Sequence, residues 1–114
     1  MNRLPAKVTR LIDDDLVRVT RFDFDAGAET GWHTHEMDYV ITAITTCQMQ
    51  LEEPGGNIRS VTVAQGEAYR RNAGVEHNVI NAGSTPMAFV EIELKTVSWL
   101  LTCLFHFPCG MSYP

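Results

Sequence analysis

Two histidines separated by one residue are the side chains of this sequence most suited to chemistry. His33 and His35 lie in the stretch 31–40, which reads GWHTHEMDYV. On a β-strand, residues i and i+2 project from the same face, so both imidazoles can point at one position. The pair is therefore a natural clamp for a transition metal. Two solvent-exposed histidines are the alternative interpretation.

A third histidine follows a glycine-bearing turn further along the chain. His77 comes three residues after Gly74, at the start of a run rich in β-branched side chains. In a closed β-barrel, this position can face the first two histidines. Three of the four histidines in the chain then lie at the openings of strands.

The elements that must position these histidines are predicted to be short strands. Turn residues, mainly Gly, Asn and Asp, recur at short intervals and leave no room for a long helix. The runs between them are rich in β-branched and aromatic residues, and the predicted strands cover residues 16–24, 39–51, 58–64, 68–71, 75–80 and 87–95. This pattern predicts an all-β, single-domain antiparallel jelly-roll β-barrel.

Composition and charge limit the classes of function. The 114 residues allow one domain, and nine basic against fourteen acidic side chains give a net charge of −5. This charge makes nucleic acid and anionic membranes unsuitable partners. The three cysteines (Cys47, Cys103 and Cys109) and the absence of an apolar leader predict a cytoplasmic protein without a disulfide framework.

Charge also separates the chain into two parts. All 23 charged residues lie between Arg3 and Lys95, so residues 96–114 carry none. We expect a domain over residues 1–95 and an uncharged apolar tail over 96–114, packed on the barrel or on a partner subunit. A tail introduced by a shifted reading frame is the second hypothesis for this segment. The apolar run 97–107 is too short to cross a bilayer as a helix.

The two histidine stretches together resemble the two sequence motifs of the cupin superfamily. The first family motif places a glycine six residues before His-x-His, as Gly27 stands before His33 here. The second motif is matched at every spacing by Gly66, Gly74, His77 and Asn81, and only its proline is replaced, by Asn72. The resemblance covers about residues 6–95 and implies a small jelly-roll barrel of the RmlC-like kind with a metal inside.

Carried over residue by residue, the resemblance makes His33, His35 and His77 the metal ligands. The family's glutamate ligand should fall at position 39 or 40, but Tyr39 and Val40 stand there. We therefore expect three histidines plus water around a divalent transition metal: Fe, Mn, Zn or Ni. Asp38 is the nearest acid. It is either a metal ligand, a hydrogen-bond acceptor that orients one of the ligands, or a carboxylate that stabilises a turn.

Other side chains are weaker candidates for the site. Tyr69 and Arg71, two residues apart, could offer a phenol and a guanidinium to an anionic substrate, although a core aromatic beside a surface charge is the favoured interpretation. Glu91 and Glu93 alternate with apolar residues, and a solvated face for both glutamates is favoured over a buried Glu91 near the metal. The catalytic candidates are thus Asp38, Tyr69 and Arg71.

The resemblance points to a metal site more strongly than to a reaction. The leading hypothesis is a metal-dependent enzyme, of oxygenase or isomerase type, acting on a small polar or carboxylate metabolite. The stretches 35–40 and 89–95 are similar to small cupins of amino-acid or β-alanine breakdown. A non-catalytic module that binds a small ligand is the second hypothesis, and a metal-free sugar-nucleotide isomerase is the third. Small cupins often pair through one sheet, so a homodimer is expected.

Overall fold

The computed structural model describes residues 2–95, which form nine strands and one short 3₁₀ turn. The predicted tail at 96–114 lies outside the described residues. The strands are β1 (Lys7–Asp13), β2 (Val17–Phe24), β3 (His33–Thr34), β4 (Asp38–Ala43), β5 (Cys47–Glu53), β6 (Asn57–Val63), β7 (Ala68–Arg71), β8 (Glu76–Asn81) and β9 (Met87–Leu94). The 3₁₀ turn, Pro54–Gly56, joins β5 to β6.

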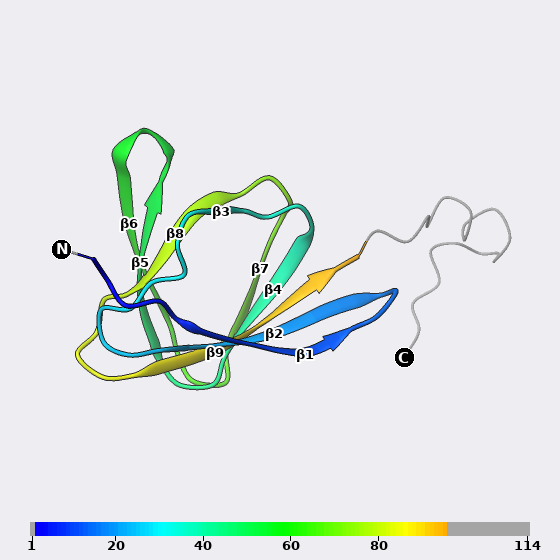
Figure 1. The fold of residues 1–114 in the computed structure, drawn as a ribbon, viewed down its shortest axis with the longest axis horizontal. Helices are drawn as coiled ribbons and strands as arrows, with labels where there is room; N and C mark the ends of the chain where they lie inside the picture. Colours follow the sequence, from blue (N-terminus) through cyan, green and yellow to red (C-terminus); the bar gives the residue numbers. More distant parts are fainter. Residues whose placement is uncertain (1, 96–114) are drawn as a thin grey trace, which may run out of the picture.

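The strands form two antiparallel sheets that face each other. One has the order β1-β2-β9-β4-β7 and the other the order β3-β8-β5-β6. The β1–β2 and β5–β6 hairpins extend from the body of the sandwich in different directions (Figure 1). The predicted all-β jelly roll is confirmed, as a sandwich of two sheets. No helix within residues 2–95 has the length and apolar character needed to cross a membrane.

The core is made by side chains that alternate along the strands. In β4 and β5, every second residue is buried, and Tyr39 and Leu51 are each 1% exposed. Phe22, Phe24 and Phe89 pack between the sheets, with ring centroids 5.3 Å apart between Phe89 and each of the other two. Buried apolar side chains from the inward faces of both sheets therefore form one core.

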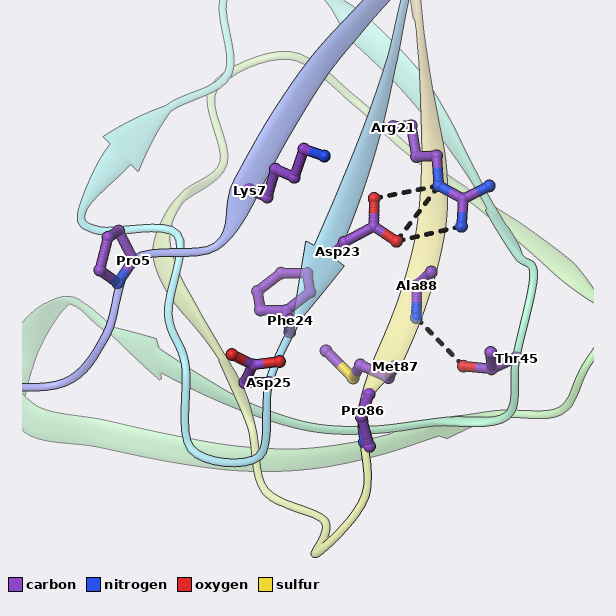
Figure 2. A pocket seen from close by; sticks show the side chains of 10 residues that line it. All are labelled: Pro5, Lys7, Arg21, Asp23, Phe24, Asp25, Thr45, Pro86, Met87 and Ala88. Atoms are coloured by element: carbon purple, nitrogen blue, oxygen red, sulfur yellow. Dashed lines mark hydrogen bonds and ion pairs between the residues drawn. The ribbon is translucent and has the colours of Figure 1, made fainter.

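Two features of the strand prediction are wrong. The predicted strand 39–51 is two strands, β4 and β5, which belong to different sheets. At the bend between them, the amides of Ile44 and Thr45 both donate to the carbonyl of Ala88. The Thr45 hydroxyl accepts from the Ala88 amide (Figure 2). Strand β1 was not predicted, since it is a charged, mostly exposed edge strand without a hydrophobic face.

The motif glycines and asparagine shape the turns around the site. Gly27, Gly66 and Gly74 have φ angles of +79°, +82° and +99°, a region that favours glycine. The buried Asn81 amide donates to the carbonyls of Asp25 and Thr85, at 3.2 Å and 2.9 Å. This asparagine therefore ties the end of β8 to the loops on either side of it.

Candidate metal centre

Three histidines meet between the two sheets. His33 on β3 is the direct cross-strand neighbour of His77 on β8, and His35 follows β3. The amide of His35 donates to the carbonyl of Val75, and the carbonyl of His35 accepts from Gly74. The turn before β8 thus holds His35 in place by its backbone. The sequence predicted this meeting through strand periodicity, although β3 ends before His35.

The Nε2 atoms of the three rings converge. That of His35 lies 3.1 Å from His33 Nε2 and 3.0 Å from His77 Nε2. Three nitrogens at right angles around one ion, each about 2.1 Å from it, would be about 3.0 Å apart. The gap that the three histidines help to line has a volume of about 10 Å³, room for about one water molecule or ion. All three ligand atoms lie within 4.8 Å of one another, so the cluster has the size of a metal site with three imidazole ligands.

Burial keeps two of these imidazoles neutral. His35 and His77 are 5% and 2% exposed. Burial, with the neighbouring His33 as the second cause, lowers the pKa of His35 to about 4 and that of His77 to about 3. Neutral imidazole is the form that binds metals, so both rings are ready to act as ligands at neutral pH.

A chain of hydrogen bonds orients His33. Its Nδ1 atom lies 2.8 Å from the carbonyl oxygen of Gly31, which can only accept, so this nitrogen carries the proton and Nε2 keeps its lone pair. The amide of Gly31 in turn donates to the side-chain oxygen of Asn78. Asn78 is held by hydrogen bonds to the carboxylates of Glu29 and Glu52, both 2.8 Å long. Sequence reasoning missed this supporting role of Asn78.

Tyr39 occupies a position where the first cupin motif places its glutamate. Its ring stacks on His35, with centroids 3.8 Å apart, and it faces the cavity that the histidines line. Burial raises the pKa of the Tyr39 phenol, which therefore keeps its proton at neutral pH. The structure thus puts a phenol beside the histidines where the motif has a carboxylate.

Asp38 points away from the histidines. Along β4 the buried residues are Tyr39, Ile41 and Ala43, so Asp38 projects from the opposite face. Its carboxylate accepts hydrogen bonds from the amide of Ala73, at 2.8 Å, and from Arg70, at 3.4 Å. This arrangement supports the turn-carboxylate interpretation of Asp38.

Replacing Asp38 with alanine is expected to leave Co²⁺ affinity within about twofold of wild type. The same change should lower the free energy of unfolding by about 1 kcal/mol, because the Ala73 amide loses its acceptor. Isothermal titration calorimetry and urea unfolding measure the two effects. Asp38→Asn, which keeps an acceptor oxygen, is the matched control. A tenfold loss of Co²⁺ affinity in Asp38→Ala would show that Asp38 is a ligand.

The two glutamates of β9 lie between the sheets, whereas the favoured prediction put both on a solvated face. Glu91 and Glu93 are 8% and 9% exposed, whereas Val90 and Ile92 point outward. Arg10 and Arg18 each lie 3.9 Å from the Glu93 carboxylate and make its burial tolerable. The sequence showed that the glutamates and the apolar residues of this strand lie on opposite faces. It did not show which face is buried, because the arginines that offset the charge of Glu93 come from β1 and β2.

Glu91 shares a cavity with the histidines. An opening of about 280 Å³ is lined by Glu91, Glu93, His33, His35 and three other residues. Burial raises the pKa of Glu91 to about 7, and the charge of Glu93 adds to this effect. The opening is where a small molecule can reach the histidines, with an acidic side chain on its opposite wall.

Removing the ionisable group of Glu91 is expected to stabilise the protein at alkaline pH. A carboxyl whose pKa is raised in the folded state contributes its stability below the unfolded pKa of 4.5 and loses it as pH rises through about 7. Glu91→Gln should therefore raise the free energy of unfolding by about 3 kcal/mol at pH 8 and by less than about 1 kcal/mol at pH 5. Urea unfolding of the metal-free protein measures this difference.

The exposed Glu67→Gln is the control for this substitution, since it removes an acid from the surface. Equal stabilisation of Glu91→Gln at both pH values would show that burial does not perturb the carboxyl of Glu91.

Tyr69 and Arg71 both face the interior from β7. They are cross-strand neighbours of Ile41 and Tyr39, respectively, and the ring of Tyr69 lines the cavity with the histidines. Burial raises the pKa of Tyr69 to about 12. Arg71 is half-buried and not the surface charge that the favoured interpretation expected. The structure therefore brings these two candidates to the histidines and leaves Asp38 outside.

A larger hollow of about 390 Å³ lies on the outer side of the sandwich. Figure 2 shows Arg21 and Asp23 at its wall, joined by hydrogen bonds between the guanidinium and the carboxylate of 3.0 to 3.2 Å. Because Asp23 neutralises this arginine, the hollow offers no free charge from it to a ligand. The three histidines line the smaller, inner cavity and not this hollow.

Comparison with known proteins agrees with this geometry. The Cupin domain family matches residues 20–93, a span that contains all three histidines. The chain belongs to the cupin family. It is 47% identical over 93 residues to the beta-alanine degradation protein BauB of Pseudomonas aeruginosa, covering 82% of this cupin and 97% of that protein.

Solved structures show the same fold. A cupin domain from Bordetella pertussis Tohama I is 47% identical and superimposes with a TM-score of 0.80, covering 84% of this cupin and 99% of that chain. The polyketide cyclase RemF from Streptomyces resistomycificus is 23% identical with a TM-score of 0.63, covering 84% and 71% of the two chains. The second likeness concerns the fold alone.

Proposed function

We propose that this cupin is a metal-dependent enzyme of oxygenase or isomerase type that acts on a small polar or carboxylate metabolite. The observation that supports the proposal is the convergence of three histidine ligand atoms, all within 4.8 Å of one another, beside an opening to the surface. His33, His35 and His77 would hold a divalent transition metal: Fe, Mn, Zn or Ni. Such an ion supplies Lewis acidity and, if it is redox-active, chemistry with oxygen.

The residues of this chain define what surrounds a bound substrate. The aromatic rings of Phe22, Tyr39 and Tyr69 line the small inner cavity with the histidines. Glu91 lines the larger opening with His33 and His35, and its raised pKa suits a group that takes up or releases a proton near neutral pH. This opening, of about 280 Å³, has room for a substrate of a few carbon atoms. The printed name of the Pseudomonas relative, beta-alanine degradation, supports a small carboxylate as substrate.

Metal analysis followed by activity measurement tests the proposal. Protein purified without added metal should contain close to one equivalent of transition metal, which His35→Ala and His77→Ala lose. The loaded protein should then consume oxygen or isomerise one of a panel of short carboxylates. Less than about a tenth of an equivalent of metal in wild-type protein, with no rebinding, would reject the metal site. Metal without turnover of any substrate would favour the second candidate.

That second candidate is a non-catalytic cupin that binds a small ligand. The observation that favours it is Tyr39, which stands at one of the two positions where the motif would have its glutamate ligand. Ligand binding by the metal-loaded protein, without chemical change of the ligand, is its expected result.

We further propose a cytoplasmic homodimer. On the outer face of the larger sheet, Ile12, Val19, Ile92 and Val40 are successive cross-strand neighbours and form an apolar row. Such a row would benefit from cover by a second copy. Light scattering at micromolar concentration should give the mass of a dimer, and a monomer would contradict this proposal.

A further inference from the structure

Four buried side-chain atoms within residues 2–95 have no hydrogen-bond partner: Arg18 Nε, Tyr39 Oη, Arg71 Nη1 and His77 Nδ1. Two of them, Tyr39 Oη and Arg71 Nη1, belong to neighbouring residues outside the histidine cluster. Tyr39 and Arg71 are direct cross-strand neighbours on β4 and β7. Buried donors are nearly always satisfied in folded proteins, so an unsatisfied pair at one place needs an explanation.

Arg71 also differs from the other arginines in its ionic contacts. The other six arginines each lie within 4.0 Å of an Asp or Glu carboxylate. For Arg71, no such carboxylate exists among the described residues 2–95. Arg18 also has an unpartnered nitrogen, but its guanidinium pairs with Asp13 and Glu93. Arg71 is therefore an inward-facing positive charge without a counterion in the described part of the chain.

The unpartnered pair lies beside the histidines. The ring of Tyr39 stacks on His35 at 3.8 Å and lines the same cavity as all three histidines. Arg71 is the cross-strand neighbour of Tyr39, and Tyr69, two residues before it on β7, lines the same cavity. A group that accepts hydrogen bonds from Tyr39 and Arg71 would thus reach a metal ion on the histidines.

We propose that Tyr39 and Arg71 form an anion site that receives a carboxylate of the substrate. The inference rests on the proposed function and names the chemical group that the site recognises. A carboxylate is acceptor-only, and its two oxygens match one phenol donor and one guanidinium donor. Its charge neutralises Arg71. A neutral carboxamide of the same size would place its NH₂ donor against the donors of Tyr39 or Arg71.

Propionate and propionamide, which differ in charge but little in shape, are the probes that test the site. Calorimetric titrations use the full chain loaded with Co²⁺, and the metal-free chain in parallel. Wild-type protein should bind propionate at least tenfold more tightly than propionamide in both forms. Arg71→Gln and Tyr39→Phe should each lose at least about tenfold in propionate affinity, while Co²⁺ affinity stays within about threefold of wild type.

Arg70→Gln is the matched control, because Arg70 is the next residue on β7 and its side chain is 63% exposed. It should bind propionate as wild type does. Arg71→Lys, which keeps the charge, serves if the glutamine variant does not fold, and should retain part of the preference for propionate. Equal affinity of wild type for both probes, or unchanged propionate binding in the Arg71 and Tyr39 variants, would overturn the proposal.

The two proposals fail separately in this design. Wild-type protein that does not bind Co²⁺ would contradict the proposed metal site, whereas the anion site is still judged by the metal-free titration. Co²⁺ binding without any preference for propionate would overturn the anion site alone.

Discussion

Replacing His77 with alanine is expected to lower the affinity for Co²⁺ or Zn²⁺ by more than about 100-fold. Outer partners of a ligand alone are worth 10- to 100-fold in metal affinity, and the ligand itself is worth more. His77 is 2% exposed, and its Nε2 atom lies 3.0 Å from that of His35, so alanine removes one of three clustered nitrogen ligands from a buried position. Competition with a chromogenic chelator measures the affinity.

The neighbouring residue provides the control. Glu76 precedes His77 on β8 but is exposed, so Glu76→Gln should bind both metals as wild type does. Unfolding curves of both variants without metal separate lost binding from lost folding. If His77→Ala binds one equivalent of Co²⁺ within about threefold of the wild-type affinity, the three histidines are not the metal site.

The same substitution should abolish stabilisation by metal. Wild-type protein at a free metal concentration 100 times the dissociation constant gains about 2.7 kcal/mol of folding free energy. For a domain of this size, such a gain raises the midpoint of thermal unfolding by about 10 to 20 °C. The metal-induced rise should be absent in His77→Ala.

Local patterns in the sequence were enough to predict the histidine site. Spacing placed His33 and His35 together, and the glycine turn before His77 identified the start of the strand that pairs with β3. These signals work because strand alternation and positive-φ glycines are local properties of the chain. The three Nε2 atoms indeed converge, as the motif spacing required.

The residues that the sequence did not predict depend on contacts between distant strands. Glu93 is buried because Arg10 and Arg18 approach it from β1 and β2, at a separation of more than 70 residues along the chain. The break between β4 and β5 depends on the carbonyl of Ala88, which belongs to β9. The sequence near Glu93 does not reveal the two arginines, and the sequence near the bend does not reveal Ala88. The bend itself contains no Gly or Pro that would have predicted it.

The motif did not predict the role of Tyr39. The sequence showed that no carboxylate stands at this position, but it did not show which side chains surround the histidines in its place. The structure shows the replacement as an aromatic ring stacked on His35, with Arg71 next to it and Glu91 on the adjoining strand β9. The charges around the site therefore come from β7 and β9 and not from the first motif.

Acid is expected to destabilise the metal-free protein through His35 and His77. Each has a pKa lowered in the folded state, to about 4 and about 3, against 6.5 when unfolded. Such a group contributes stability above pH 6.5, and that stability is lost as pH falls toward the folded pKa, because the unfolded chain binds the proton first. On going from pH 8 to pH 5, the two histidines together should lower the free energy of unfolding by about 4 kcal/mol.

Glu91 opposes this loss, because its raised pKa makes acid favourable to the folded state. On going from pH 8 to pH 5, the protonation of Glu91 raises the free energy of unfolding by about 2 to 3 kcal/mol. Wild-type protein treated with a chelator should therefore lose only about 1 to 2 kcal/mol of its free energy of unfolding. Glu91→Gln removes the compensation and should lose the full amount of about 4 kcal/mol. Urea unfolding at the two pH values measures both. Parallel losses in the two proteins would show that Glu91 and the histidines do not titrate in opposition, and that the acidic wall of the cavity is already ionised in the folded protein.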